Sequence, residues 1–80
     1  RAHMEGQRET DLLRQSLSEY VHLLMQVRRM PDSPLQAEME LLATGGLIRS
    51  AKRLQRSALV EKHAPRFVAL AASMGSAPLF

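Results

Sequence analysis

The chain has 80 residues with neither Cys nor Trp, which excludes disulfide frameworks, thiolate metal sites and Cys nucleophiles. Hydrophobic residues make up 45% of it but aromatic residues only 4%, which argues against a disordered polar tail and favours helices over strands. The formal net charge of +3 is uneven, because residues 1–40 hold five Lys/Arg and seven Asp/Glu whereas residues 41–80 hold six and one. A chain this short forms one small domain at most, and it relies on well-packed helices or on a partner.

The beginning of the chain carries no recognisable targeting segment. Residues 1–3 resemble a vector-derived remnant, so the fold is predicted from Met4 onwards. No apolar run reaches the roughly 18 residues that cross a bilayer, and no charged segment followed by an apolar run marks a secretory signal. We therefore expect a cytoplasmic protein without membrane insertion.

A first helix is predicted over residues 11–30. Five apolar residues recur there at alternating spacings of four and three, the heptad pattern of a helix that packs along one partner helix. These seam residues are Leu13, Leu17, Tyr20, Leu24 and Val27. Thr10 or Asp11 is expected to cap the start of the helix, and Pro31 is expected to end it.

A turn at residues 31–33 leads into a second helix, predicted over residues 34–63. Ser33 and Gln36 have the spacing of a capping box, and Pro34 stands at the first helical position. Two successive apolar stripes are expected to face the first helix. One contains Leu35, Met39, Leu42 and Gly46, and the other contains Ala43, Leu47, Ala51, Leu54 and Ala58.

Two positions govern the continuity of this second helix. Gly45-Gly46 either breaks it or allows a close approach of the first helix, and the lack of turn residues at 47–50 favours the unbroken helix. Pro65 is expected to end the helix and to open a short third one, with Gly75 as its stop. That third helix has Phe67, Leu70 and Met74 on one side.

The predicted fold is therefore all-α. Residues 4–64 form an antiparallel, coiled-coil-like helical hairpin, because the connection at 31–33 is too short for any other arrangement. Residues 65–80 add a short C-terminal helix and a loose tail.

The apolar residues cover more of both long helices than one hairpin contact can bury. The C-terminal segment could fold back over the surplus, or a partner protein or a second copy could cover it. The second alternative is preferred, and we predict a partner interface on two additional stripes. Its residues are Leu12, Leu23, Met30, Leu41, Ile48 and Leu59.

A basic stripe is predicted on the second helix at the spacings i, i+3, i+4 and i+7. It contains Arg49, Lys52, Arg53 and Arg56. These side chains could contact nucleic-acid phosphates, face solvent, or pair with Glu9 and Asp11 across the hairpin. The absence of interleaved aromatic residues disfavours nucleic-acid binding.

No catalytic, metal or cofactor site is predicted, so the sequence favours a non-enzymatic protein. His22 and His63 have no ligand at a metal-binding spacing. Glu38 and Glu40, two residues apart, point to different sides of a helix. Gly45-Gly46 lacks the context of a phosphate-binding loop.

Three segments carry a resemblance to a known family: Leu12-Leu13-Arg14-Gln15, the Pro31–Pro34 turn, and Leu41-Leu42-Ala43-Thr44-Gly45-Gly46-Leu47. Over residues 9–63 the chain resembles the small co-chaperones of type III secretion needle subunits. The resemblance implies a cytoplasmic accessory protein of a virulence system. Such a protein binds a larger helical-repeat chaperone, and the pair keeps the needle subunit soluble and unpolymerised.

Our preferred prediction is thus a co-chaperone that works by protein binding, without a cofactor. Two alternatives stay open. The chain could form a homodimeric four-helix bundle with a regulatory or structural role, or it could bind nucleic acid through the basic stripe.

Overall fold

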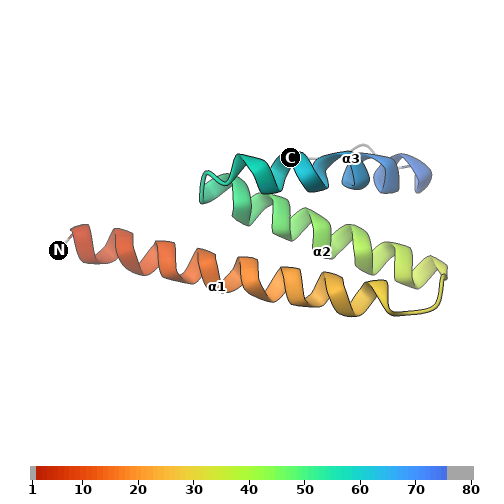
Figure 1. Ribbon diagram of the computed structural model, residues 1–80, viewed down its shortest axis with the longest axis horizontal. Coiled ribbons are helices and arrows are strands. Elements are labelled where there is room, and N and C mark those ends of the chain that lie inside the picture. Colours follow the sequence, from red (N-terminus) through yellow and green to blue (C-terminus); the bar gives the residue numbers. More distant parts are fainter. Residues whose placement is uncertain (1, 76–80) are drawn as a thin grey trace.

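Three α-helices account for nearly all of residues 2–75, the part of the chain that the computed structural model describes (Figure 1). They are α1 (Ala2–Arg28), α2 (Pro34–Arg53) and α3 (Ser57–Ser73). The predicted all-α fold, a hairpin followed by a shorter C-terminal helix, is confirmed. The predicted tail at 76–80 and Arg1 of the predicted remnant lie outside the described residues.

Helix α1 begins earlier than predicted. It starts at Ala2 instead of residue 11, so neither Thr10 nor Asp11 caps it. The Thr10 hydroxyl donates a hydrogen bond of 3.0 Å to the Gly6 carbonyl inside the helix. Helix-forming residues such as Glu5, Gln7 and Arg8 extend the helix without help from the apolar seam.

The turn between α1 and α2 has the predicted cap. The Ser33 hydroxyl accepts a hydrogen bond of 3.0 Å from the Gln36 backbone N–H, and Pro34 opens the helix. The Gln36 side chain does not complete the box but donates to the Val27 carbonyl at 3.3 Å, at the end of α1. The glutamine thereby connects the two helices and fixes the antiparallel hairpin.

The hairpin core follows the predicted seam of α1. Leu17, Leu24 and Val27 are buried, and the first two pack against α2. On α2 the buried partners are Ala43, Leu47 and Ala51. Each buried Leu contributes about 1.5–3 kcal/mol to folding. These three residues belong to the second of the two stripes predicted for α2. Leu35 and Leu42 of the first stripe are exposed and do not contribute to this core.

Helix α2 runs without interruption through Gly45 and Gly46, as predicted. The ring of Tyr20 from α1 lies so close to Gly46 that a Cβ there would overlap it. On the other side, a Cβ at Gly45 would lie 2.9 Å from the ring of Phe67 in α3. The two glycines thus let α2 receive one aromatic ring from each neighbouring helix.

The single helix predicted over 34–63 is wrong, because α2 ends at Arg53. Gln55 has a φ of 59°, in the left-handed region. Its N–H donates to the Lys52 carbonyl, and the Arg56 N–H donates to the Ala51 carbonyl at 2.8 Å. This is a Schellman ending with glutamine where glycine is usual, so no residue in this segment signals the end of the helix.

Pro65 does not end a helix, which is a second error in the prediction. It lies inside α3, which continues to Ser73 and is followed by Gly75 with a φ of 72°. The residues after Pro65 hold this helix in place, because Phe67, Leu70 and Ala71 are buried. Packing on α2 outweighs the backbone hydrogen bond that a proline cannot donate.

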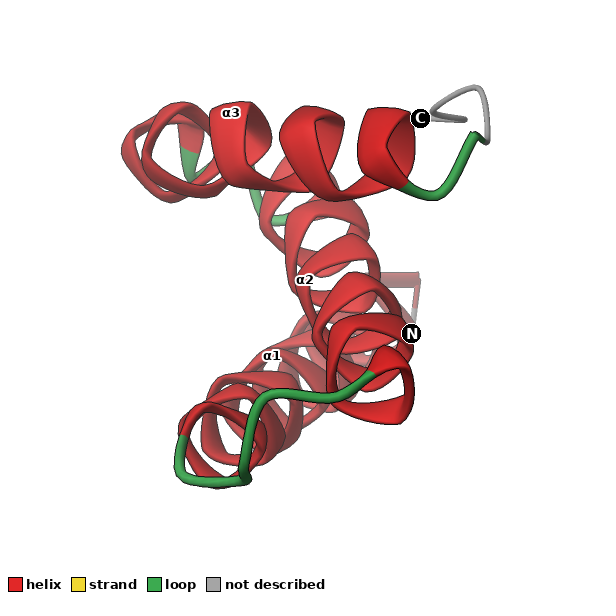
Figure 2. Cartoon of the chain, turned by 90° about the vertical axis from the view of Figure 1, so that its right-hand side faces the viewer, coloured by secondary structure: helices red, strands yellow, loops and turns green. Residues whose placement is uncertain are grey.

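The three helices form an open layer in which α2 is central (Figure 2). Both α1 and α3 pack on α2, but their backbones do not pack on each other. The described residues extend 47 × 23 × 18 Å. Each outer helix therefore has one neighbour and leaves much of its circumference uncovered.

Candidate functional site

The predicted partner interface is not a single exposed surface. Ile48 is completely buried, at 0% exposure, within the face of α2 that the folded-back α3 covers. Leu23 and Leu59 pack partly against the core, and Met30 and Leu41 are half-buried. Of the six residues, Leu12 alone is widely exposed. The alternative in which the C-terminal segment covers one stripe is the one observed.

The exposed apolar residues of α2 belong instead to the other stripe. Leu35 is 59% exposed and Leu42 is 71% exposed, although both were expected to face the first helix. Arg49, also exposed, follows Leu42 by the same interval of seven residues. A spacing of seven places residues on one side of a helix, so these three share a surface.

A matching series runs along α1 in the opposite direction. Ser16 and Leu23 are seven residues apart on α1, Met30 follows seven residues later just beyond its end at Arg28, and each of the three is half-buried. The hairpin is antiparallel, with Tyr20 of α1 beside Gly46 of α2. This register pairs Met30 with Leu35, Leu23 with Leu42, and Ser16 with Arg49. We call this set the hairpin face: Ser16, Leu23, Met30, Leu35, Leu42 and Arg49.

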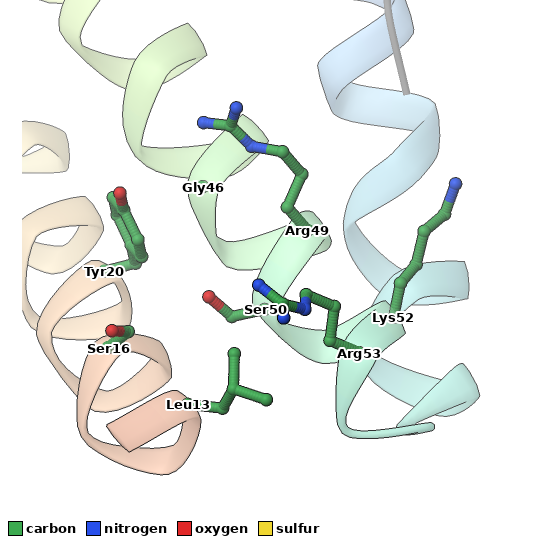
Figure 3. Close-up of a pocket in the computed structure, with 8 residues that line it drawn as sticks. All are labelled: Leu13, Ser16, Tyr20, Gly46, Arg49, Ser50, Lys52 and Arg53. Atoms are coloured by element: carbon green, nitrogen blue, oxygen red, sulfur yellow. The ribbon is translucent and has the colours of Figure 1, made fainter. Parts of the chain in front are cut away.

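At the Ser16–Arg49 end, the hairpin face opens into a groove of about 540 Å³ between α1 and α2. Its lining is Leu13, Ser16, Tyr20, Gly46, Arg49, Ser50, Lys52 and Arg53 (Figure 3). The groove combines an apolar base with hydroxyl, ammonium and guanidinium groups. None of the lining residues is acidic.

The predicted basic stripe is divided between two places. Arg49 and Arg53 line the hairpin groove, whereas Arg56 lies beyond the end of α2. Arg56 lines a second hollow of about 360 Å³ at the α2–α3 turn, and Lys52 lines both. The Schellman ending turns the chain, so Arg56 is not in phase with the other three.

The predicted pairing of the stripe with the front of α1 is not found for its three arginines. Among the described residues, no ion pair joins Glu9 or Asp11 to Arg49, Arg53 or Arg56. The guanidinium groups of Arg49 and Arg53 accordingly have no carboxylate partner in the part of the chain that the structure describes.

Among the described residues an ion pair between exposed Arg66 and buried Glu40 links α2 and α3, and no feature of the sequence analysis predicted it. Arg66 donates from Nε and Nη2 to the two carboxylate oxygens of Glu40, at 3.1 and 3.2 Å. Glu40 is buried, and this pairing raises the pKa of Arg66. The pair serves to hold α3 on α2, since both carboxylate oxygens are used.

His63 is buried on α3 near two cations. Burial first, and then the charges of Lys62 and Arg28, lower the pKa of His63. His22, on α1, is exposed and hydrogen-bonds to Gln26. Within residues 2–75 no three His, Asp or Glu side chains gather where they could hold a metal ion.

The comparisons with known proteins assign no family to this chain. The sequence matches no protein-family model, and neither the curated proteins nor the solved structures gave a match. Across the described residues, none of the helices has the length and apolar character needed to cross a bilayer.

Sequence reasoning identified half of the hairpin face and missed the groove. Leu23, Met30 and Arg49 were singled out, but Ser16 was not, and Leu35 and Leu42 were expected to face the first helix. The seven-residue spacing on both helices was present in the sequence. This spacing shows which residues of α1 and α2 lie side by side only when the register of the hairpin is known, and the contact of Tyr20 with Gly46 provides that register.

Proposed function

We propose that this chain is a non-enzymatic interaction protein that binds a helix of a partner protein on the hairpin face. The observation that carries the proposal is the exposure of Leu35 and Leu42 beside the half-buried Leu23 and Met30. The seven-residue spacing and the register of the hairpin place these four apolar side chains on one side of the two helices, with exposed Glu38 between Leu35 and Leu42. A contiguous exposed apolar area rimmed by polar residues is typical of a binding surface.

The fold supplies the geometry that such binding needs. Two antiparallel helices leave a shallow furrow along their common surface, and a third helix packs there as in a helical bundle. On α2, the neighbouring position is already taken by α3, whose Phe67 packs against Gly45. The partner helix would occupy the equivalent position over α1 and α2.

Burial of the exposed leucines would provide useful binding energy. Removing two Leu side chains from water contributes about 3–6 kcal/mol before the costs of association. Binding would also mask the apolar stripe of the partner helix. This is the mechanism expected of a co-chaperone, which keeps a partner from associating with itself.

The resemblance to the co-chaperones of type III secretion needle subunits suggests which partners to test first. They are a helical-repeat chaperone and a needle subunit, in the cytoplasm. No residue of the hairpin face is transferred from that family, since the surface is defined by burial and register in this chain alone.

The test is affinity capture from cells of the source organism, with quantitative mass spectrometry. The wild-type chain should retain a helical partner, and the L35D/L42D variant should lose it. Val68→Asp is the matched control, because Val68 is an exposed apolar residue of α3 outside the hairpin face. Equal retention by all three proteins, or loss only with Val68→Asp, would refute the proposed function.

A further inference from the structure

The two ends of the hairpin face differ in chemistry, and this difference constrains the partner. One end is apolar, at Met30 and Leu35. The other end is the groove, where Arg49 and Arg53 have no carboxylate partner among the described residues and no lining residue is acidic. We infer that the face binds an amphipathic helix that carries Asp or Glu at one end and places those carboxylates in the groove. This inference rests on the proposed function and adds the chemistry and the polarity of the partner.

The polar side chains of the groove suit an anion. Ser16, Tyr20 and Ser50 carry hydroxyl groups that can donate hydrogen bonds, and Arg49 and Arg53 carry guanidinium groups. Carboxylates pair with guanidinium groups through two parallel hydrogen bonds, a geometry that also fixes the orientation of the incoming side chain. A neutral or basic helix end would leave these donors unpaired beneath it.

The spacing of the hairpin face defines the length of the partner segment. Seven residues of helix rise about 10.5 Å, so the three pairs of the hairpin face extend over about 21 Å. A bound helix would need about 14 residues to cover them. Its apolar residues would lie over Leu35 and Leu42, and its carboxylates would follow about one heptad beyond the residue over Leu42.

Small residues in the groove let the partner backbone approach closely. Ser16 and Ser50 lie between the larger side chains of the lining, whereas Gly46 is covered by the ring of Tyr20. Long acidic side chains can therefore reach Arg49 and Arg53 while the apolar stripe stays in contact with the leucines. The groove volume of about 540 Å³ leaves room for more than one carboxylate side chain.

A second copy of this chain fits the surface less well. In a symmetric antiparallel dimer through the hairpin face, Arg49 of one copy would lie against Leu35 of the other. A parallel arrangement would place Arg49 near Arg49. In the antiparallel arrangement, exposed Glu38 lies one turn from Leu35 and offers a single carboxylate to the two guanidinium groups of the other copy, whereas the parallel arrangement offers none. Either arrangement therefore buries at least one guanidinium group without a carboxylate, which is unfavourable.

Nucleic acid is also disfavoured by the composition of this surface. The groove cations Arg49, Lys52 and Arg53 adjoin the exposed leucines of the hairpin face, and an apolar stripe gives a phosphate backbone nothing to bind. The ring of Tyr20 packs on Gly46 and is not free to stack on bases. An acidic amphipathic helix would bury the exposed leucines with its apolar residues and pair the groove arginines with its carboxylates.

The inference is testable with two fluorescein-labelled synthetic helical peptides that share one leucine stripe. Three Glu residues stand at one end of the first peptide and three Gln residues stand at the same positions of the second. Fluorescence anisotropy at low salt should show the wild-type chain binding the Glu peptide about tenfold more tightly, as expected for two to three partly exposed ion pairs. Raising the salt concentration should reduce this preference.

Variants separate the inference from the proposed function. R49E/R53E should lose the preference for the Glu peptide and still bind the Gln peptide through the leucines. R14E/K62E, with the same change of net charge at exposed positions outside the groove, should keep the preference. L35D/L42D should bind neither peptide. Circular dichroism checks that each variant is folded.

Each other outcome is decisive. Equal affinity of the wild-type chain for both peptides overturns the inference and leaves the proposed function standing. Binding of neither peptide by the wild-type chain overturns both. Tighter binding of a labelled single-stranded RNA 20-mer than of the Glu peptide, lost in R49E/R53E, also overturns the inference in favour of nucleic acid.

Discussion

The ring of Tyr20 in α1 lies directly against Gly46 in α2. A Cβ at this position would overlap the ring, so the contact requires glycine. It sets the register that pairs Ser16 with Arg49 and Leu23 with Leu42. The alignment of residues on the hairpin face therefore depends on Tyr20 and Gly46, which line the groove and lie away from the apolar end.

Gly46→Ala should destabilise the fold by about 2–3 kcal/mol, because the gain in helix propensity is smaller than the cost of overpacking. Thermal and urea unfolding measure the change. Gly6→Ala is the control, since nothing lies near that glycine, and it should stabilise the chain by about 0.5–1 kcal/mol. Equal effects of the two substitutions would contradict the close contact. Y20A/G46A should cost less than the sum of its single variants.

Gln55→Gly should stabilise the chain by about 1 kcal/mol. Gln55 occupies the left-handed position of the Schellman ending, where a side chain is strained and glycine is not. Gln15→Gly in the middle of α1 provides the comparison and should destabilise by a similar amount. Urea unfolding distinguishes the two signs, and a destabilising Gln55→Gly would show that α2 does not end at this turn.

Pro65→Ala should stabilise α3 by about 1–3 kcal/mol, since alanine restores a backbone donor within a continuous helix. Far-ultraviolet circular dichroism and thermal unfolding report the effect. Reduced helicity on this substitution would argue that Pro65 starts a helix, as the sequence alone suggested, and does not lie inside one.

Arg66→Met should destabilise the chain by about 1–3 kcal/mol, because it leaves the buried carboxylate of Glu40 unpaired. Arg66 itself is largely exposed, so most of this cost comes from Glu40. E40Q/R66M should recover part of the loss, which a double-mutant cycle in urea measures. Strict additivity of the two substitutions would mean that the pair does not form.

Stability should fall as the pH is lowered below about 6.5, the ordinary pKa of histidine. The pKa of His63 is lower than this in the folded chain, so between the two values the unfolded state binds a proton that the folded state does not. Unfolding free energies measured from pH 7.5 to pH 5 should show this slope, and His63→Gln should reduce it. His22→Gln, at an exposed position, should leave it in place.

The parts of the fold that follow from local rules were predictable. The heptad seam of α1, the Ser33 cap and the start of α2 at Pro34 depend on residues close in sequence, and all three are confirmed. The unbroken passage through Gly45 and Gly46 was also predicted, because the neighbouring residues contain no turn chemistry.

The wrong predictions concern helix ends at which tertiary packing overrides a local sequence preference. Glutamine rarely takes a left-handed backbone conformation, yet α2 ends at a turn in which Gln55 has one. Proline usually ends a helix, yet α3 continues through Pro65. Burial of Ile48, Phe67 and Leu70 between α2 and α3 outweighs both preferences. Such long-range gains cannot be read from sequence spacing.

The candidate site was half predictable for a related reason. Helix α2 has two apolar stripes of similar quality, and periodicity does not say which of them faces α1. Burial shows that Leu47 does and that Leu42 does not. The surplus of apolar surface was correctly noticed, but most of the predicted interface residues are covered within the chain itself.

Site-specific photo-crosslinking in cells of the source organism tests the central claim most directly. A benzophenone amino acid placed at Leu42 should form a covalent adduct with a helical partner protein. The same group at Val68 on α3 should form none, although that position is also exposed. Adducts at Val68 with none at Leu42, or no adduct at either position, would contradict the assignment of the hairpin face as the binding surface.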